Sequence, residues 1–442
     1  MISILTFLLG MSFLVLLLLS FRRFQDRTKF YALFVLGIFL AINGVGIAVP
    51  PAVTNPLTEY GVEPWWLLQA GIACVPVALA ICWVLTQGNV RDEATVYPSL
   101  ILRSEFFWIL LGLNLVFAAI TLRFMAADGF DKVSMIFQID SFESLYRERY
   151  SFDQEHGHGW FSSFIIYRYM ALLTCGLILV YAKQYPLWIR YACTAPLLLI
   201  TLLRSATELQ RGPIITQLLL IVSLMVLPWI LTRSRNSLVF NRSTLGNRTT
   251  IVTFGLFAIV VAVGLVIFQA THEEESAIVS LPRRVFVIPA HTAGLYFGLF
   301  PDTISFRGIT GSFTMPLGEW TNWQTDTFNL KQIGYYANGH AHHPNANCIA
   351  SAYTADGWVS VGLVSGVFIA LVLWFNKAFS RVDAIYPALA TIITFHGVYA
   401  AIQADFVAAV TLGFGISQGL MILAAMVCLR QDESSYTLGD WS

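Results

Sequence analysis

The chain has 442 residues, of which 57% are hydrophobic and 12% are charged, and its formal net charge is zero. Soluble globular proteins carry about 25% charged residues. The composition therefore excludes an ordinary soluble enzyme and indicates a polytopic membrane protein. The neutral net charge gives no argument for a nucleic-acid partner. The six cysteines occur singly, without a CxxC pair, which argues against a disulfide framework or a structural zinc site.

A membrane-spanning helix needs about 20 mostly apolar residues, and eleven segments meet this requirement or come close to it. In chain order they are 2–20, 30–50, 64–86, 105–123, 162–182, 188–203, 213–231, 250–270, 349–375, 384–402 and 406–429. The first lacks a basic n-region and a cleavage site, so we expect a retained helix and no signal peptide. The sequence predicts an all-α fold of about 11 transmembrane helices, with 1–442 as a single integral membrane domain.

Positive charge sets the orientation of the predicted helices, because cytoplasmic loops are enriched in Lys and Arg. Segment 21–29 holds four basic residues, and 232–249 holds four more without any acid. With both on the cytoplasmic side, the N-terminus lies outside and the C-terminus inside. The inner side then carries 15 Lys+Arg and 8 Asp+Glu, a balance of +7, against 11 and 18, a balance of −7, outside. Both long loops, 124–161 and 271–348, lie on the outer side, where we expect any chemistry.

Two outer arginines bracket the short connection between the sixth and seventh segments. Arg204 and Arg211 lie near the expected membrane surface, and the pair Gly212-Pro213 restarts a helix. One interpretation is a snorkelling anchor or an ion pair with Glu208. The other is a clamp for a lipid-borne phosphate, since the planar guanidinium group binds phosphate oxygens bidentately.

The large loop 271–348 contains a second arginine pair. Arg283 and Arg284 precede the apolar run Val285–Pro289, and His291 and Gly294 follow. This order predicts a helix lying on the outer leaflet or dipping into it, with two cations at headgroup depth. The alternative is an ordinary amphipathic surface helix.

The end of the same loop concentrates aromatic, imidazole and amide side chains. Histidine serves as a general base near neutral pH, and Asn and Tyr side chains suit sugar hydroxyls. No metal-ligand spacing such as HExxH occurs, so we expect neither a metal nor another cofactor; a polar loop with surface histidines is the alternative. The residues are Tyr335, Tyr336, His340, His342, His343, Asn345 and Asn347.

Three features resemble the Wzy O-antigen polymerases of bacterial inner membranes. Arg283-(x)10-Gly294 is similar to an arginine motif at the start of a large periplasmic loop. Asn345-x-Asn347-(x)2-Ala350-x-Ala352-Tyr353-(x)3-Gly357 resembles the segment that leads from that loop into the next helix. The order of helices, moderate loop, short Arg-Gly-Pro connection and large loop is also alike. In the first loop Arg147 departs from the paired motif, because its nearest glycine, Gly157, comes one residue early.

The resemblance implies a GT-C-like glycosyltransferase with two larger periplasmic loops. It would transfer a glycan from undecaprenyl diphosphate onto a new lipid-linked repeat unit. Its expected partners are this lipid-linked oligosaccharide, the lipid bilayer and a chain-length regulator protein. Its implied catalytic residues are Arg211, Arg283 and Arg284 for the diphosphate, with His343 or His291 as the base. Its implied substrate-binding residues are Arg204, Arg147, Asn345, Asn347, Tyr353, Tyr335 and Tyr336.

Two other classes of protein remain open at this point. An O-antigen ligase, or another lipid-linked glycosyltransferase, would use the same donor with a different acceptor and would carry similar outer arginines. A transporter or flippase would need polar residues deep inside its helices. The predicted spans are mostly apolar, with Asn43, Asn114 and His396 as the main exceptions.

Overall fold

The computed structural model describes residues 1–21, 23, 28–50, 62–87, 100–126, 169–206, 211–235, 283–306, 333, 346–382, 385–403 and 415–431. Most of these residues are helical, which confirms the all-α prediction. The chain divides into two compact units. Unit 1 comprises Met1–Tyr97 and Val279–Ile422, and unit 2 comprises Pro98–Ile278 and Leu423–Ser442.

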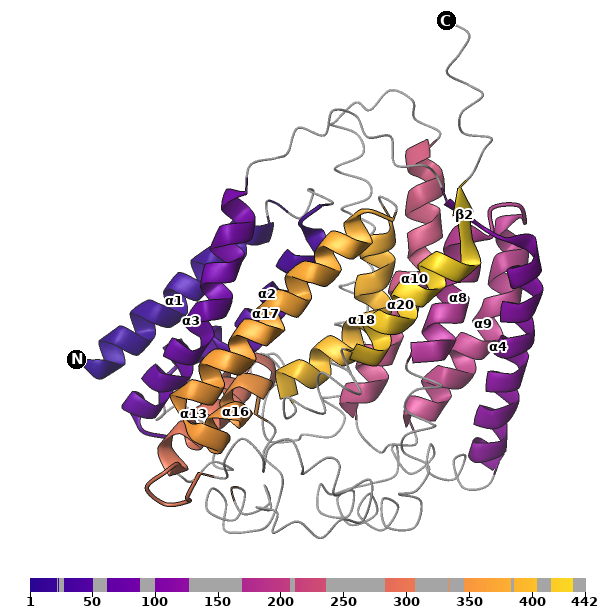
Figure 1. Ribbon diagram of the computed structural model, residues 1–442. Coiled ribbons are helices and arrows are strands. Elements are labelled where there is room, and N and C mark those ends of the chain that lie inside the picture. The colour runs from indigo at the N-terminus through magenta and orange to yellow at the C-terminus, as the bar shows by residue number, and fades with distance from the viewer. Residues whose placement is uncertain are drawn as a thin grey trace, which may run out of the picture. The chain divides into compact units, whose positions relative to one another are not determined.

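Unit 1 is built around one central helix. This helix, α2 (Phe30–Asn43), contacts α1 (Ile2–Phe21), α3 (Pro64–Thr86), α17 (Trp358–Ser380) and α18 (Tyr386–Gln403) (Figure 1). Aromatic rings fill the spaces between these helices: Tyr31 meets Phe379 at 5.1 Å between ring centroids, and Phe39 meets Phe368 at 5.2 Å. Nine of the fourteen residues of α2 are buried, which gives unit 1 its core.

Four short elements complete the described part of unit 1. They are the 3-10 turn η1 (Val45–Ala48), the π-helical turn η6 (Arg283–Val287), α13 (Ile288–Leu299) and α16 (Cys348–Asp356). At 1.5 Å per residue, α13 and α16 are too short to cross a bilayer. A further helix, α20 (Ile416–Cys428), begins in unit 1 and ends in unit 2.

Unit 2 contains four described long or medium helices and a small sheet. The helices α4 (Ser104–Phe124), α8 (Ala171–Tyr181), α9 (Leu187–Ala206) and α10 (Arg211–Arg235) pack together, with α8 and α9 each contacting the other three. Strands β1 (Leu100–Leu102) and β2 (Leu429–Gln431) pair antiparallel, with Ile101 opposite Arg430. The Lys183 Nζ donates a 2.7 Å hydrogen bond to the Leu100 carbonyl, which ties the α8–α9 connection to β1.

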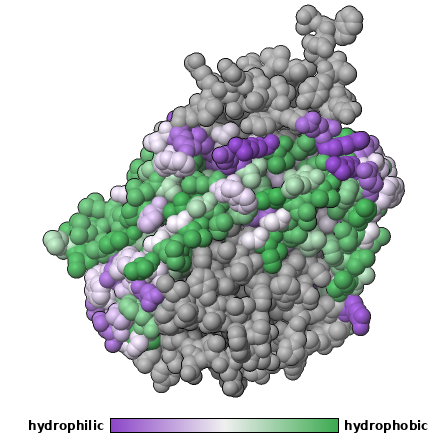
Figure 2. All heavy atoms as spheres, in the orientation of Figure 1, coloured by the Kyte–Doolittle hydropathy of each residue, from purple (hydrophilic) through white to green (hydrophobic). Residues whose placement is uncertain are grey.

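Six helices within the described ranges are long and apolar enough to cross a membrane: Ile2–Phe21, Phe30–Ala48, Pro64–Thr86, Ser104–Arg123, Leu187–Ser205 and Trp358–Ser380. The bounds of the first five agree closely with the corresponding predicted spans, and the membrane-protein class is confirmed. The predicted span 250–270 lies outside the described residues. The total of eleven therefore stays a prediction. In Figure 2, hydrophobic residues cover the helices of each unit and hydrophilic residues gather near helix ends.

One predicted span is wrong, because the structure divides it into two helices. The segment 349–375 is not one helix, because α16 ends at Asp356 and α17 begins at Trp358. Gly357 between them has φ +63°, in the left-handed region that residues with a Cβ rarely adopt. Its N–H donates a 2.9 Å hydrogen bond to the Tyr353 carbonyl and closes α16. The span therefore shifts to 358–380, and α16 becomes a separate element.

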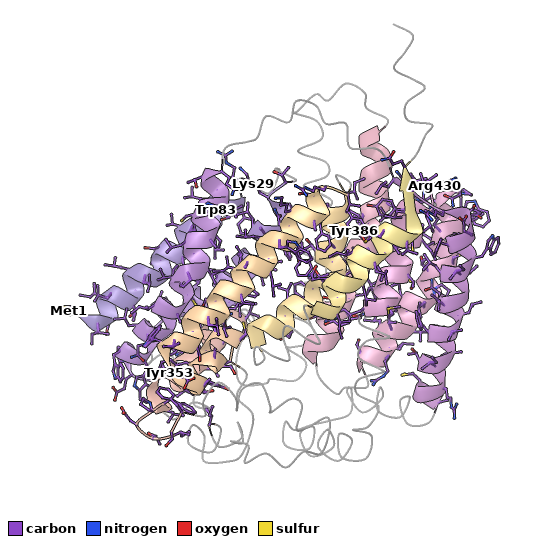
Figure 3. The ribbon with its side chains drawn as sticks, in the orientation of Figure 1. Met1, Lys29, Trp83, Tyr353, Tyr386 and Arg430 are labelled. Atoms are coloured by element: carbon purple, nitrogen blue, oxygen red, sulfur yellow. The ribbon has the colours of Figure 1, made fainter. Side chains whose placement is uncertain are left out.

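Lys29 and Tyr353 lie at opposite ends of unit 1 (Figure 3). At the Lys29 end, the lysine Nζ donates a 2.5 Å hydrogen bond to the Gln87 carbonyl, which joins the start of α2 to the end of α3. Asn376 joins α17 to the same place, because its Nδ2 donates to the Thr28 carbonyl at 2.6 Å and its Oδ1 accepts from the Ala32 N–H at 3.0 Å. The short elements gather at the Tyr353 end.

Candidate functional site at the Tyr353 end of unit 1

The helix α13, which follows the Arg283–Arg284 pair after one π-helical turn, is mostly buried inside unit 1. Eight of the twelve residues of α13 are buried, and the helix packs against α3, α16 and η1. Val285 and Phe286, just before α13, are 37% and 40% exposed, so the prediction of a helix on or dipping into the outer leaflet stays a prediction for this run, whereas α13 itself is not a surface helix. The physical reason is that the apolar residues of α13 lie on all sides of the helix, and an element of this kind must be covered all round.

The start of α3 forms the surface on which α13 packs. Pro64 occupies the first helical position of α3, where its missing N–H costs nothing. Val62 directly precedes the N-cap of α3, Glu63, and Leu67 is the fourth residue of the helix. This is the spacing of a hydrophobic staple. Both are buried in one cluster with Leu295 of α13, and Trp66 packs against this cluster. The chain entry into α3 and the position of α13 are thus fixed by the same contacts.

The turn that carries Arg283 docks directly on η1. A Cβ on Gly46 would lie 1.9 Å from the Phe286 carbonyl oxygen, so only glycine permits this approach of the two backbones. Arg283 is half-buried at the first position of η6. The structure describes the backbone of Arg284 but not its side chain. The Arg283–Arg284 backbone is therefore held against the end of α2 at the Tyr353 end of the unit.

His291 is buried beneath η1, with 2% of its surface exposed. Its Nε2 lies 3.2 Å from the Val49 carbonyl, and because a carbonyl only accepts, the ring donates here. Burial lowers the pKa of His291 to about 4, against the opposing effect of the Val49 and Gly46 carbonyls. The imidazole is therefore neutral at pH 7, and its Nδ1 has no hydrogen-bond partner among the described residues.

Asn347 is the N-cap of α16. Its Oδ1 accepts hydrogen bonds from the Ile349 and Ala350 N–H groups at 3.0 and 2.8 Å, which satisfies two of the free donors at the helix start. Its Nδ2 donates to the Asn43 Oδ1 at 3.0 Å, and the Asn43 Nδ2 donates to the Phe39 carbonyl at 3.1 Å. Both amides are buried. This geometry gives Asn347 a structural role, joining α16 to the end of α2.

Tyr353 lies in a cluster of aromatic rings from three segments. Its ring centroid is 4.5 Å from that of Phe297 in α13, 5.7 Å from that of Trp358 in α17 and 5.6 Å from that of Phe306 in the segment after α13. Burial and the nearby negative charge of Asp302 raise the pKa of Tyr353. The side chain therefore stays a neutral hydrogen-bonding phenol at physiological pH.

Unit 1 therefore brings the side chains of four predicted site residues, Arg283, His291, Asn347 and Tyr353, and the backbone of a fifth, Arg284, to one end of its helices. Two more lie in unit 2, where Arg204 is buried in the last turn of α9 and Arg211 is the first residue of α10. The predicted short connection between them is confirmed, since only 207–210 separate the helices. The side chain of Arg211 lies outside the described atoms.

The remaining predicted residues fall outside the described ranges: Arg147, Tyr335, Tyr336, His343 and Asn345. Sequence reasoning missed Phe306 and Trp358, although an aromatic residue directly after a helix-breaking glycine was a usable signal. In the sequence Asn43 is only a polar exception in an apolar span. A buried amide of this kind needs a hydrogen-bond partner, and that partner is Asn347.

Within the described ranges, no group of three or more His, Cys, Asp or Glu side chains is placed to hold a metal ion. The histidine tract 340–343 is not among those residues, so the expected absence of a metal stays a prediction. Comparison of the chain with family models, curated proteins and solved structures gives no match.

Proposed function

We propose that this membrane protein is a glycosyltransferase that polymerises lipid-linked repeat units of a bacterial surface polysaccharide at the periplasmic face of the inner membrane. One observation carries the proposal. Three elements too short to span a bilayer, η6, α13 and α16, carry Arg283, His291 and Tyr353, and Tyr353 lies at the end of unit 1 opposite Lys29. A protein that only spans a membrane has no need of such elements, whereas an enzyme acting on a lipid-linked substrate needs side chains held at headgroup level.

The reaction defines what these side chains must do. A hydroxyl of the acceptor sugar attacks the anomeric carbon of the donor, a glycosidic bond forms, and the bond to the diphosphate oxygen breaks. The leaving diphosphate gains negative charge, which a guanidinium group stabilises. Arg283 supplies such a group in unit 1, and Arg211 and Arg284 are the further candidates from the sequence. The proton of the attacking hydroxyl passes to a general base.

The two candidate bases differ in their suitability. His291 is buried, donates to the Val49 carbonyl and has a pKa lowered to about 4, so it is a poor proton acceptor at neutral pH. We therefore assign His291 to holding η1 in place beneath η6. His343 remains our candidate for the base. This assignment separates a positioning histidine from a reacting one.

The test is gel analysis of surface lipopolysaccharide from a strain that lacks this protein, with the wild-type gene restored as the control. Loss of the polymerase leaves a single repeat unit on the lipid core. Absence of any repeat unit on the core, together with polymer accumulated on the lipid carrier, would instead identify a ligase. Precursor held on the cytoplasmic side would identify a flippase. An unchanged ladder of chain lengths would contradict all three functions.

A further inference from the structure

The aromatic cluster at the Tyr353 end is partly open to its surroundings. Trp358 is 41% exposed and Phe306 is 38% exposed, although both rings contact Tyr353, which is only 6% exposed. Trp358 also stacks on the buried ring of Phe297, with centroids 5.4 Å apart and an angle of 30° between the rings. Buried rings therefore hold the two exposed rings in fixed orientations. We call Phe306, Tyr353 and Trp358 the aromatic shelf.

Two exposed carboxylates accompany the aromatic shelf. Asp356 is the last residue of α16, two positions before Trp358, and Asp302 lies in the segment that leads to Phe306. The charge of Asp302 acts on Tyr353, which places this carboxylate close to the shelf. The described segments that form the shelf, 295–306 and 346–362, contain no lysine or arginine. The charged side chains of these described segments are therefore the two acids, Asp302 and Asp356.

We propose that the aromatic shelf, with Asp302 and Asp356, is a binding subsite for an uncharged or amino-substituted pyranose ring of a glycan. The face of an aromatic ring carries partial negative charge, and the C–H groups on one face of a pyranose carry partial positive charge, so the two faces stack. Each carboxylate accepts hydrogen bonds from sugar hydroxyls on the edge of the ring. The proposal rests on the proposed function, because it names the part of the protein that holds the glycan.

Charge favours a glycan over a lipid headgroup as the occupant. Tryptophan at the end of a spanning helix also serves as an interfacial anchor, and Trp358 begins α17. An anchor among the phosphates of a bilayer suits neighbouring cations, which attract anionic headgroups. The aromatic shelf is accompanied instead by two carboxylates, Asp302 and Asp356. Its exposed tryptophan is also stacked on Phe297 at one face, an arrangement that fixes the ring for binding.

The test measures binding of one probe, the repeat-unit oligosaccharide released by mild acid from the lipid carrier of the same bacterium. Saturation-transfer-difference NMR on the purified full chain in detergent gives the dissociation constant. Trp358→Leu and Phe306→Leu keep apolar volume and remove the ring faces, and we expect each to weaken binding at least about tenfold. Asp356→Asn should weaken it about threefold. Trp358→Phe should bind within about threefold of wild type, because it keeps a ring.

The matched control is Trp374→Leu. Trp374 is 56% exposed on the same helix α17, sixteen residues and therefore about 24 Å from Trp358. It should bind the oligosaccharide as wild type does. Equal binding by wild type, Trp358→Leu and Phe306→Leu would overturn the subsite. A second result would also overturn the subsite: Trp358→Leu and Trp374→Leu lose equal thermal stability, and both still bind the oligosaccharide as wild type does. Trp358 would then be an interfacial anchor.

The outcome is separable from that of the proposed function. A deletion strain that loses its polymer while the purified protein shows no shelf-dependent binding leaves the polymerase standing and removes the subsite. A strain with an unchanged ladder, whose protein still binds the oligosaccharide through Trp358, removes the polymerase and keeps the glycan site.

Discussion

The two units use buried polar residues in different ways. In unit 2 the polar groups lie along the helices and bond to one another: the Thr174 Oγ1 donates to the Asn114 Oδ1 at 2.5 Å, and Cys175 Sγ lies 3.8 Å from both the Asn114 Nδ2 and the Thr194 carbonyl. Unit 1 has such a bond too, from the Gln418 Nε2 to the Tyr31 hydroxyl, but it also gathers Asn43, His291 and Asn347 around the short elements at one end. The first arrangement joins packed apolar helices. The second fixes segments that are too short to span a membrane.

In this chain the candidate functional residues of unit 1 lie on the short elements and not in the middle of the spans. A polar residue in the middle of a span, such as Asn114, attracts attention in the sequence because polar groups in a bilayer are costly. Its partners are all inside unit 2, so its contribution is to packing. The elements that present Arg283 and Tyr353 are held by ordinary contacts, a helix cap and a hydrophobic staple.

Gly46→Ala should have the largest effect, because the added Cβ would lie 1.9 Å from the Phe286 carbonyl oxygen. The two backbones must move apart to admit it, and we expect a loss of about 3 kcal/mol of stability with little folded protein recovered. Gly366→Ala in unit 1 and Gly112→Ala in unit 2 are the controls, since nothing lies within 4 Å of either added Cβ. Thermal unfolding in detergent measures the effect. A Gly46→Ala variant as stable as the controls would contradict the docking.

Cysteines at the two ends of unit 1 should label in opposite ways, because these ends are predicted to face opposite sides of the membrane. In a chain with Cys82→Ser, we place one cysteine at exposed Gln87 and another at exposed Asp302. Asp302→Cys should react with a membrane-impermeant thiol reagent in cells with a permeabilised outer membrane. Gln87→Cys should react only after lysis. Equal labelling before lysis would remove the proposed orientation.

The spans were predictable because hydrophobic length dictates them, and 64–86 agrees with α3 to the residue. The break at Gly357 was not, since the apolar run continues through it and only the backbone angle interrupts the helix. The burial of α13 depends on its contacts with Val62 and Leu67, which lie more than 200 residues away in sequence. The aromatic shelf likewise combines rings from three segments. Local pattern reading cannot predict contacts of this kind.

His291→Gln tests whether this histidine positions η1 or acts as the base. Burial lowers the pKa of His291 from 6.5 to about 4, so below pH 6.5 the unfolded chain binds a proton that the folded chain does not. The free energy of unfolding should therefore fall as pH falls from 6.5 towards 4, by about 3 kcal/mol at most. Glutamine keeps a donor for Val49 and does not titrate, so unfolding of His291→Gln should depend less on pH in this range.

The activity of the same variant gives the second measurement. If His291 only positions η1, the pH dependence of polymerisation between pH 6 and 8 should match that of wild type, with a lower rate throughout. Loss of an inflection in that range would show that His291 itself takes the proton, and our assignment of the base to His343 would be wrong.

Asn347→Ala in unit 1 and Thr174→Val in unit 2 are expected to lower the stability of the protein by similar amounts. The first removes the cap of α16, and the second removes one hydrogen bond inside unit 2, so each should lower stability by about 1–2 kcal/mol. Only Asn347→Ala should shorten or abolish the surface polymer at equal protein level, because α16 carries Tyr353. Asn347→Ser, which keeps a capping hydroxyl, should restore most of the polymer. Equal polymer in Asn347→Ala and Thr174→Val would remove the functional contrast between the units.

Removal of divalent metal should have the smallest effect. The leaving diphosphate needs positive charge, and the proposed mechanism takes it from arginine side chains, Arg283 in unit 1 among them, so a metal ion has no assigned role. The histidines 340, 342 and 343 are the residues that challenge this view, because imidazoles bind transition metals readily. With purified protein and lipid-linked repeat units, EDTA should leave the rate of polymerisation unchanged within about twofold. A larger loss of polymerisation rate, with the rate restored by Zn²⁺ or Mn²⁺, would identify these histidines as metal ligands. Arg283→Lys would then be expected to retain activity, because the metal and not the guanidinium group would bind the diphosphate.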